Sequence, residues 1–337
     1  MPLGPVLRRV AEGESLSTEE MTAAIDSVMR GETTDIQVAA LLTALHAKGE
    51  TPEEIAGAAI SLRKHMQRIE SSRTGLLDTC GTGGDGSGTF NISTAAALVT
   101  AAAGVPVAKH GNRAATSRSG SADVLVELGV RIDAEPETVT ACLDELGICF
   151  CFAPLAHQSM KNVAAVRREL GFRTIFNLVG PLANPAQAEY QLIGVGAAKL
   201  RSKLAQALAV MGCGRAVVVH GCDGLDEVTL SGPTEVSIVE HDSVSGMQWT
   251  PEDFDIPEQP GADLHADSPQ ASAAVIRHVL SGQPGAARDI VVVNAAAALW
   301  TAGAADSLRD AAQMAAAAID DRRAAELLDK LAKRSRE

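Results

Sequence analysis

The chain is short of aromatic residues and of long apolar runs. Only 3% of its 337 residues are Phe, Trp or Tyr, so its core must be packed from Ala, Val, Leu and Ile. No apolar stretch is long enough to cross a membrane, and the N-terminus lacks the continuous apolar segment of an export signal. We therefore expect a cytoplasmic protein that has no membrane partner.

The chain also lacks long basic runs and cysteines spaced as in a metal site. A formal net charge of −13, together with the few aromatic residues, argues against a nucleic-acid partner. None of the six cysteines is paired as in a zinc site, so we expect reduced and mostly buried thiols. In Cys149-Phe150-Cys151 we expect strand alternation to send the two thiols to opposite faces. The length and a 46% hydrophobic content predict a globular protein of one large domain or two unequal ones.

A helical region comes first in the chain. Ser17, Thr34 and Thr51 each stand where a helix N-cap is expected, and residues 1–70 show no strand pattern. From about Gly75, short apolar runs alternate with Ala-rich helical runs, which predicts a mostly parallel sheet covered by helices. The expected strands are 76–79, 105–108, 148–152, 191–196, 215–220 and 290–294. The expected helices are 94–103, 121–128, 136–146, 198–211, 270–280 and 296–319, with an antiparallel addition within 225–250.

A glycine-rich segment, residues 78–94, runs directly into a helix start. Glycines let backbone N–H groups turn towards an anion, and the helix start adds unpaired N–H groups and the positive end of the helix dipole. No Asp or Glu occurs in residues 86–122, while that stretch contains Lys109, His110, Arg113 and Arg118. An acid-free, basic stretch in an acidic protein predicts a site for a ligand with several phosphates.

A dinucleotide-binding fold is the first alternative, because Gly81, Gly83 and Gly86 match the G-x-G-x-x-G pattern. That fingerprint calls for an acidic residue about twenty positions later, to bind the ribose hydroxyls. No acid follows the loop before Asp123. We also expect the loop, which lies after a helical domain, not to follow the first strand of a doubly wound sheet. These points disfavour a dinucleotide. A purely structural turn is the simpler alternative, but five glycines in the eight residues 81–88 are more than a tight turn requires.

Three further segments extend the predicted site. The basic turn 109–113 follows an apolar run, and the hydroxyl-rich residues 116–121 precede another helix. The acids Asp226 and Glu227 follow the buried-strand run 217–220, where Mg²⁺ bridged to substrate phosphates would fit. Taken singly, these are also typical of a solvated turn, a helix cap and surface acids. Either arginine of the pair 167–168 could bind a carboxylate bidentately or lie on a solvated face.

Together the motifs resemble the anthranilate phosphoribosyltransferase family, and the resemblance covers nearly the whole chain. The segments that carry it are 49–57, 78–85, 91–94, 109–113, 119–125, 173–185 and 224–227. Several such motifs in the same order are highly specific.

The resemblance implies an α/β fold of the nucleoside phosphorylase/phosphoribosyltransferase type. Residues 1–72 would form a small all-helical domain, and residues 73–337 a larger catalytic α/β domain with a mostly parallel central sheet. The helical domain would form a homodimer, and residues 155–172 would pack on it near the hinge. The implied reaction transfers the phosphoribosyl group of 5-phosphoribosyl-1-diphosphate to the amine of anthranilate, with two Mg²⁺ ions per site.

The resemblance also assigns the site residues. Those expected at phosphoribosyl diphosphate are Gly81, Gly84, Asp85, Thr89, Asn91, Ile92, Ser93, Thr94, Lys109, His110, Gly111, Asn112, Arg113, Ala114, Ala115, Thr116, Ser117 and Ser121. Those expected at anthranilate are Gly81, Asn112 and Arg167, and those expected at magnesium are Ser93, Asp226 and Glu227. Arg167 is chosen over Arg168 by counting back from the motif 173–177. No general base is assigned, because a neutral arylamine needs none, and Lys109 is expected to give electrostatic support.

Two segments depart from the family pattern. Residues 265–273 lack the expected Gly-Gly and Asn-Ala, which leaves the structure before the late helix open. Residues 156–160 vary around a His-containing loop, which leaves the geometry near anthranilate open. A pyrimidine nucleoside phosphorylase of the same architecture is an alternative, although it would carry a Lys-Met-Ser-Gly-like segment at 109–113. A non-catalytic relative that binds nucleic acid is another, and the acidic composition argues against it.

Overall fold

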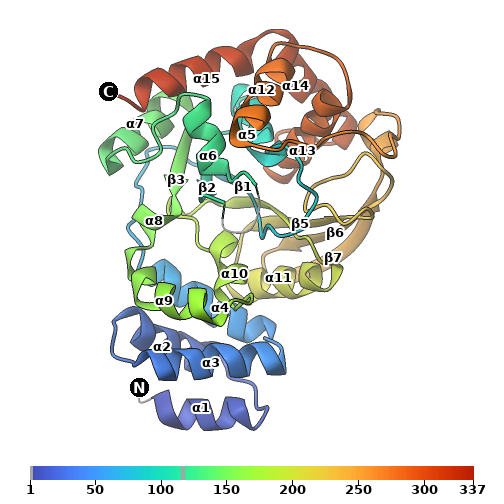
Figure 1. Cartoon of the computed structure of the whole chain (residues 1–337). Helices are drawn as coiled ribbons and strands as arrows, with labels where there is room; N and C mark the ends of the chain where they lie inside the picture. The colour runs from blue at the N-terminus through green and yellow to red at the C-terminus, as the bar shows by residue number, and fades with distance from the viewer. Residues whose placement is uncertain (1–2, 115–117) are drawn as a thin grey trace.

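The computed structural model describes residues 3–114 and 118–337. A helical region, drawn in blue, lies at one end of the molecule, and an α/β region with a central sheet lies above it (Figure 1). Within the residues described, no helix has both the length and the apolar character that a bilayer crossing requires. The small helical part and larger α/β part agree with the predicted fold class.

The helical region begins with α1 (Leu3–Ala11), α2 (Thr18–Met29), α3 (Asp35–Lys48) and α4 (Pro52–Lys64). Ser17, Thr34 and Thr51 each cap the helix that follows: the side chain accepts a hydrogen bond from a backbone N–H of the first turn, and a Glu or Gln side chain of that turn accepts one from the backbone N–H of the cap residue. Such reciprocal bonds satisfy amide groups that have no partner within the helix. The three predicted helix starts are therefore confirmed.

The sheet has seven strands in the order β3-β2-β1-β4-β5-β6-β7. Their bounds are β1 Leu77–Gly81, β2 Val107–Gly111, β3 Ile148–Phe152, β4 Tyr190–Gly194, β5 Arg215–Gly221, β6 Thr234–Glu240 and β7 Ser243–Trp249. The first five in chain order are parallel, while β6 and β7 add to β5 as an antiparallel hairpin. The antiparallel addition expected within 225–250 is confirmed. Because the chain order reverses between β1 and β4, the carboxyl ends of these strands form the crevice in which open α/β sheets bind ligands.

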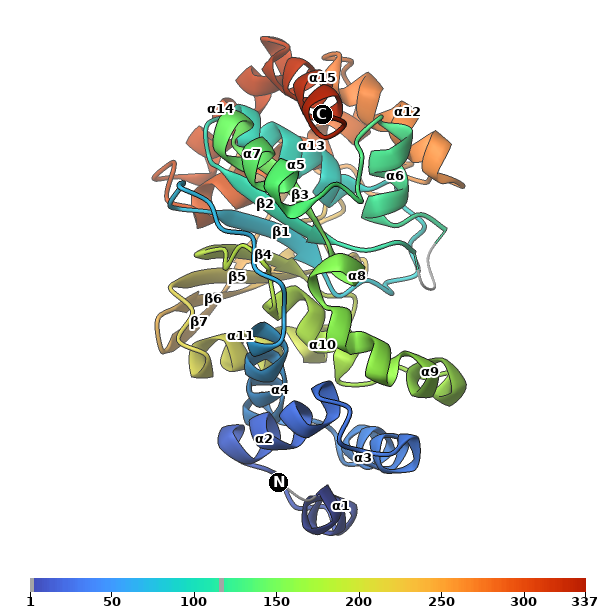
Figure 2. The ribbon, with the colours of Figure 1, turned by 90° about the vertical axis from the view of Figure 1, so that its left-hand side faces the viewer.

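Helices cover both faces of this sheet. One face lies under α5 (Ile92–Ala102) and α13 (Ala286–Thr301), with α12 (Pro269–Leu280), α14 (Leu308–Asp320) and α15 (Arg323–Arg334) at the top of the molecule (Figure 2). Beside them, α7 (Pro136–Leu146) packs on β3, and α6 (Ser121–Glu127) packs on α12. The other face packs on α11 (Ala198–Val210). The buried hydrophobic residues form two clusters, an upper cluster on the side of α5 and α13 and a lower cluster on the side of α11. Because side chains alternate along a strand, Val217 and Val219 of β5 belong to the upper cluster, and Ala216 and Val218 belong to the lower one.

The lower cluster also contains the core of the helical region, so the two parts are packed together. The segment after β3 contributes α8 (Ala153–Ala156), α9 (Lys161–Leu170) and α10 (Phe176–Val179). α9 packs on α2 and α3, and α10 packs on α4. One wall of the sheet's crevice is thus built on the helical region, although these residues are far from it in sequence.

Some predicted elements are wrong. Residues 290–294 form part of α13 rather than a strand, because this Ile/Val run lies in a helix whose other residues are buried as well, and a short apolar run does not separate the two cases. The single helix expected over 296–319 is two, since Gly303 takes a left-handed conformation (φ 72°) and Ser307 caps α14. The glycine loop does follow the first strand of the sheet, contrary to our expectation.

The prediction for the two thiols of β3 is also wrong. The Sγ atoms of Cys149 and Cys151 lie 3.8 Å apart, because residues two apart in a strand share a face. All six cysteines are free, as expected.

Gly57 lets α2 and α4 approach closely. A Cβ atom at this position would lie 2.5 Å from the carbonyl oxygen of Thr18 and 2.9 Å from the Cβ atom of Met21. Neither is the mobile end of a side chain, so the helices would have to separate.

We expect Gly57→Ala to lower the stability of the protein by about 1–3 kcal/mol through overpacking. Gly4→Ala, in α1, is the matched control, because no atom lies within 4 Å of the added Cβ. Thermal unfolding of both variants tests this: equal melting temperatures would contradict the close contact.

Candidate active site

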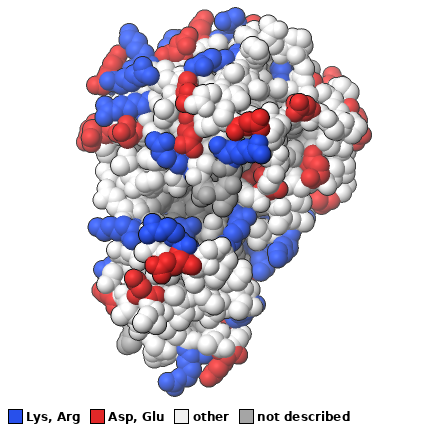
Figure 3. Space-filling view, viewed as in Figure 1, with Lys and Arg blue, Asp and Glu red and all other residues white. Residues whose placement is uncertain are grey.

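The predicted residues meet in one cleft of about 470 Å³ at the carboxyl ends of β1 and β2. In the space-filling view, the surface is hollowed between the helical and the α/β parts, with Lys and Arg side chains on both sides of the hollow (Figure 3). Predicted residues that line the cleft are Gly81, Gly84, Asp85, Thr89, Asn91, Ile92, Ser93, Lys109, His110, Gly111, Asn112, Arg113, Ala114, Ser121, Asp226 and Glu227.

The other predicted positions do not appear in this lining. Thr94 is only 1% exposed and lies behind the cleft surface. Arg167 is half-buried on α9, while its neighbour Asn177 lines the cleft. Ala115, Thr116 and Ser117 lie outside the described residues, as does the first part of the hydroxyl-rich segment.

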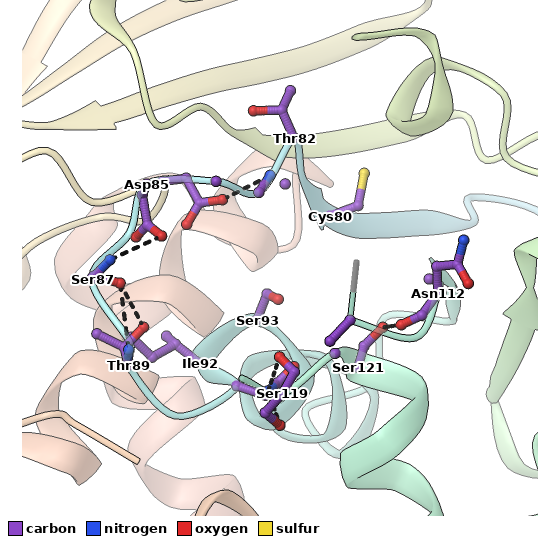
Figure 4. A pocket seen from close by; sticks show the side chains of 18 of the residues that line it. Cys80, Thr82, Asp85, Ser87, Thr89, Ile92, Ser93, Asn112, Ser119 and Ser121 are labelled. Atoms are coloured by element: carbon purple, nitrogen blue, oxygen red, sulfur yellow. Dashed lines mark hydrogen bonds between the residues drawn. The ribbon is translucent and has the colours of Figure 1, made fainter. Parts of the chain in front are cut away.

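The glycine-rich loop joins β1 to α5 and forms one wall of the cleft (Figure 4). Gly83 and Gly84 adopt φ angles of 61° and 78°, in the left-handed region that favours glycine. The N–H of Gly83 donates to a carboxylate oxygen of Asp226 at 3.1 Å, and the N–H of Ser93 donates to Glu227 at 3.1 Å. Both amide groups thus already face anionic oxygens.

Gly194, at the end of β4, brings the acidic loop against the glycine loop. A Cβ atom there would lie 1.6 Å from the carbonyl oxygen of Asp226, so no other residue fits without moving the chain. The sequence reasoning missed this position. The sequence marks this position only by a glycine near the carboxyl end of the predicted strand 191–196.

The acids sit in an environment that disfavours their negative charge. Burial raises the pKa of Asp226 to about 7, and the nearby carboxylate of Asp85 adds to the shift. Burial, together with Asp226, raises the pKa of Glu227 well above its ordinary range. Crowded acids of this kind favour a bound cation.

The donor set fits magnesium that is shared with a substrate. Asp226, Glu227 and the Ser93 hydroxyl offer oxygen atoms, which Mg²⁺ prefers. Within residues 3–114 and 118–337, no three His, Cys, Asp or Glu side chains are grouped so that they could hold a metal ion. Mg²⁺ is typically held by one or two carboxylates plus substrate phosphates and water, so this set is sufficient.

Lys109 is only 3% exposed. It lies within β2, since this strand runs to Gly111, further than the sequence pattern predicted. Its ammonium group donates to the carbonyl oxygen of Thr79 and lies 3.4 Å from the hydroxyl of Ser93. Burial lowers its pKa, and the carboxylates of Asp78 and Glu227 oppose the shift. The lysine therefore stands beside the acids, at the cleft floor, where an added polyphosphate would favour its charged form.

Asp123 shapes the basic turn that follows β2. Its carboxylate accepts hydrogen bonds from the backbone N–H groups of Ala114 (2.9 Å) and Gly120 (3.1 Å) and from the guanidinium of Arg113 (2.9 Å). Burial opposes the effect of these three bonds, and the net result is a lowered pKa for Asp123. The first acid after the glycine loop thus serves to fold the basic turn.

Arg167, near the end of α9, lies next to a residue of the cleft rather than in its lining. Its guanidinium lies 5.7 Å from the ring centre of Phe176 and 3.5 Å from the side-chain oxygen of Asn177. Burial lowers its pKa. Arg168, by contrast, is exposed. A partly desolvated guanidinium beside an aromatic ring is suited to an aromatic carboxylate.

The segment that departs from the family pattern nevertheless fastens the glycine loop. The N–H of Phe90 donates to the carbonyl of Leu264 at 2.9 Å, and the N–H of Ala266 donates to the carbonyl of Gly88 at 3.0 Å. The hydroxyl of Ser272 accepts from the N–H of Asn91 at 2.9 Å. The helix α12 still begins normally, at Pro269.

The comparisons with known proteins identify the family to which this fold belongs. Residues 73–325 match the glycosyl transferase family a/b domain, and residues 4–66 match the helical bundle domain of that family. An anthranilate phosphoribosyltransferase of Symbiobacterium thermophilum is 50% identical over 326 residues, or 97% of this chain and 96% of that protein. One of Moorella thermoacetica is 50% identical over 95% of this chain and 94% of its own length.

This chain belongs to the anthranilate phosphoribosyltransferase family. The predicted family is thus confirmed, in preference to the nucleoside phosphorylase alternative. The family match also excludes the dinucleotide-binding alternative. The position of the glycine loop after the first strand would not have excluded it.

Solved structures of this family have the same fold. That of anthranilate phosphoribosyltransferase from Thermus thermophilus superposes with a TM-score of 0.92 at 41% identity, covering 98% of this chain and 99% of that one. A Saccharomyces cerevisiae enzyme in complex with PRPP and Mg has a TM-score of 0.89 at 26% identity, covering 99% and 98%. A relative of this fold therefore binds magnesium.

Two buried histidines, His110 and His157, face each other, and His110 also contributes to the lining of the cleft. The Nε2 atoms of His110 and His157 are 3.2 Å apart, so one ring donates and the other accepts. Burial lowers the pKa of His110 to about 3, with repulsion from His157 adding to it, and burial lowers the pKa of His157 to about 4. Both rings are neutral at physiological pH.

Because the folded protein resists protonation of these rings and the unfolded chain does not, stability should fall as the pH drops from about 6.5 towards 4. Each ring contributes at most about 1.4 kcal/mol per pH unit. We expect His157→Gln to weaken this pH dependence, measured by urea unfolding across the range. His278→Gln, at an exposed position of α12, should leave the slope unchanged. A wild-type slope in His157→Gln would contradict the expectation.

Proposed function

We propose that this protein transfers the phosphoribosyl group of 5-phosphoribosyl-1-diphosphate to the amine of anthranilate. The products are N-(5-phosphoribosyl)anthranilate and diphosphate, in tryptophan biosynthesis. The observation that carries the proposal is the meeting of the glycine loop, Lys109 and the acids Asp226 and Glu227 in one cleft. The chain is also 50% identical, over 97% of its length, to a relative of that name.

The phosphates would lie against the glycine loop and the basic turn. The N–H groups of a glycine loop and of a helix start can bind phosphate oxygens without a side chain in the way, and that of Gly83 would exchange its present carboxylate partner for a phosphate. Lys109, at the cleft floor, adds a positive charge that stabilises diphosphate as it leaves. Asp226, Glu227 and Ser93 would hold Mg²⁺, which when bound neutralises charge on the phosphate oxygens.

The amine needs no residue to remove a proton before it attacks. The nitrogen of an aromatic amine is neutral at physiological pH, so its lone pair is free. What the site must supply is orientation of the amine towards the ribose carbon that bears diphosphate. We assign this to Asn112 and Gly81 at the cleft and to Arg167, whose guanidinium would bind the carboxylate of anthranilate.

Further parts of the proposal concern assembly and location. The helical region, residues 1–72, would form a homodimer, and exposed Ile36 on α3 (81%) is an apolar residue available to a second copy. Two Mg²⁺ ions per site and a cytoplasmic location complete the proposal. All six thiols are free, as is typical of a reducing compartment.

The test of the reaction is the loss of anthranilate fluorescence when the protein, Mg²⁺ and phosphoribosyl diphosphate are mixed with anthranilate. We expect loss that requires both Mg²⁺ and the diphosphate substrate. Asp226→Asn and Glu227→Gln should lower the rate and raise the Mg²⁺ concentration required, because a carboxylate ligand is lost. Unchanged fluorescence with the wild-type protein would overturn the proposed function.

A second test separates the two substrates. Arg167→Ala should raise the KM for anthranilate by roughly tenfold or more, the order expected for a lost charged hydrogen bond. It should leave the KM for phosphoribosyl diphosphate nearly unchanged. Arg168→Ala, at the exposed neighbour on α9, is the control and should behave as wild type. Equal effects on the two KM values would contradict the role of Arg167.

A further inference from the structure

Arg173 reaches from the segment between α9 and α10 to the glycine loop. Its Nη2 atom donates to the carbonyl oxygens of Thr82 (2.7 Å) and Gly83 (2.9 Å). The guanidinium also lies against Gly84, because a Cβ atom there would be 2.6 Å from Nη1. Arg173 itself lines the cleft. The sequence motif contained this arginine, but no part of the reaction described above uses it.

The two carbonyl bonds determine the direction of two amide groups. In a trans peptide unit the C=O and the next N–H point in opposite directions. The carbonyl of Thr82 faces Arg173, and the N–H of Gly83, in the same peptide unit, points the other way, to Asp226 at 3.1 Å. The carbonyl of Gly83 also faces Arg173, so the N–H of Gly84 must point away from the guanidinium. Glycine has no side chain to restrict its backbone, so without the bonds to Arg173 these peptide units would rotate with little steric resistance.

We propose that Arg173 is a positioning residue, which holds the peptide units 82–83 and 83–84 so that their N–H groups face the diphosphate of the substrate. The inference rests on the proposed function and names a residue that this function requires. When Asp226 turns to other ligands, the N–H of Gly83 loses its present partner and becomes available to a phosphate oxygen. Arg173 keeps the peptide unit from rotating during that exchange.

The position of Arg173 in the fold supports this role. The segments on either side of it belong to the lower core, where Val163 of α9 and Phe176 of α10 pack with the helical region. Arg173 therefore attaches the loop of the α/β part to the wall that also carries Arg167. The same wall would hold anthranilate and align the loop that binds the diphosphate.

The test compares Arg173→Ala and Arg173→Lys with the wild type. Losing charged hydrogen bonds to two carbonyls should raise the KM for phosphoribosyl diphosphate by roughly tenfold or more. The KM for anthranilate should change little. Arg173→Lys should recover part of the loss, because an ammonium group can still donate to a carbonyl. Titration calorimetry with phosphoribosyl diphosphate and Mg²⁺ should give the same order of affinities.

Arg323→Ala is the matched control. This exposed arginine also donates to a distant backbone carbonyl, that of Ala102 at 2.7 Å, but lies away from the cleft. It should leave both KM values unchanged. A wild-type KM for phosphoribosyl diphosphate in Arg173→Ala would overturn the inference, as would an equal rise in both KM values. If the wild-type protein itself fails to consume anthranilate, the proposed function falls, and the calorimetry still decides whether Arg173 affects binding of the diphosphate.

Discussion

The cleft depends on one close contact between backbones. At Gly194 the end of β4 touches the carbonyl of Asp226, with no room for a side chain. This contact places two acids of the loop after β5 beside the glycine loop after β1, although the two loops are far apart in sequence. The reversal of strand order between β1 and β4 opens the crevice, and the missing side chain lets the acidic loop enter it.

Ionisable groups of opposite sign lie close together here, and burial opposes the charge of each. Lys109 is directed to a carbonyl and a hydroxyl, while Asp226 and Glu227 are bound by backbone N–H groups. Each charged group is therefore held by a neutral dipole. Dipoles that are held in place before a charged ligand enters are the basis of electrostatic preorganisation.

Much of this could be predicted from the sequence, because local signals were strong. The caps at Ser17, Thr34 and Thr51 depend on side chains a few residues apart, and the glycine loop is a contiguous motif. The contacts of Gly194 and Arg173 could not be predicted in the same way, since they join segments far apart in the chain. The run at 290–294 was misjudged because burial on all sides removes the periodicity that distinguishes a helix from a strand.

The fastening of the glycine loop by residues 264–266 has a consequence for how this surface can vary. The two bonds run between main-chain atoms, from Phe90 to Leu264 and from Ala266 to Gly88. Neither specifies a side chain at positions 264 or 266. An exposed position of this stretch, such as His265, can therefore change over evolutionary time while both bonds are inherited unchanged, so a poor sequence match there is weak evidence of altered chemistry.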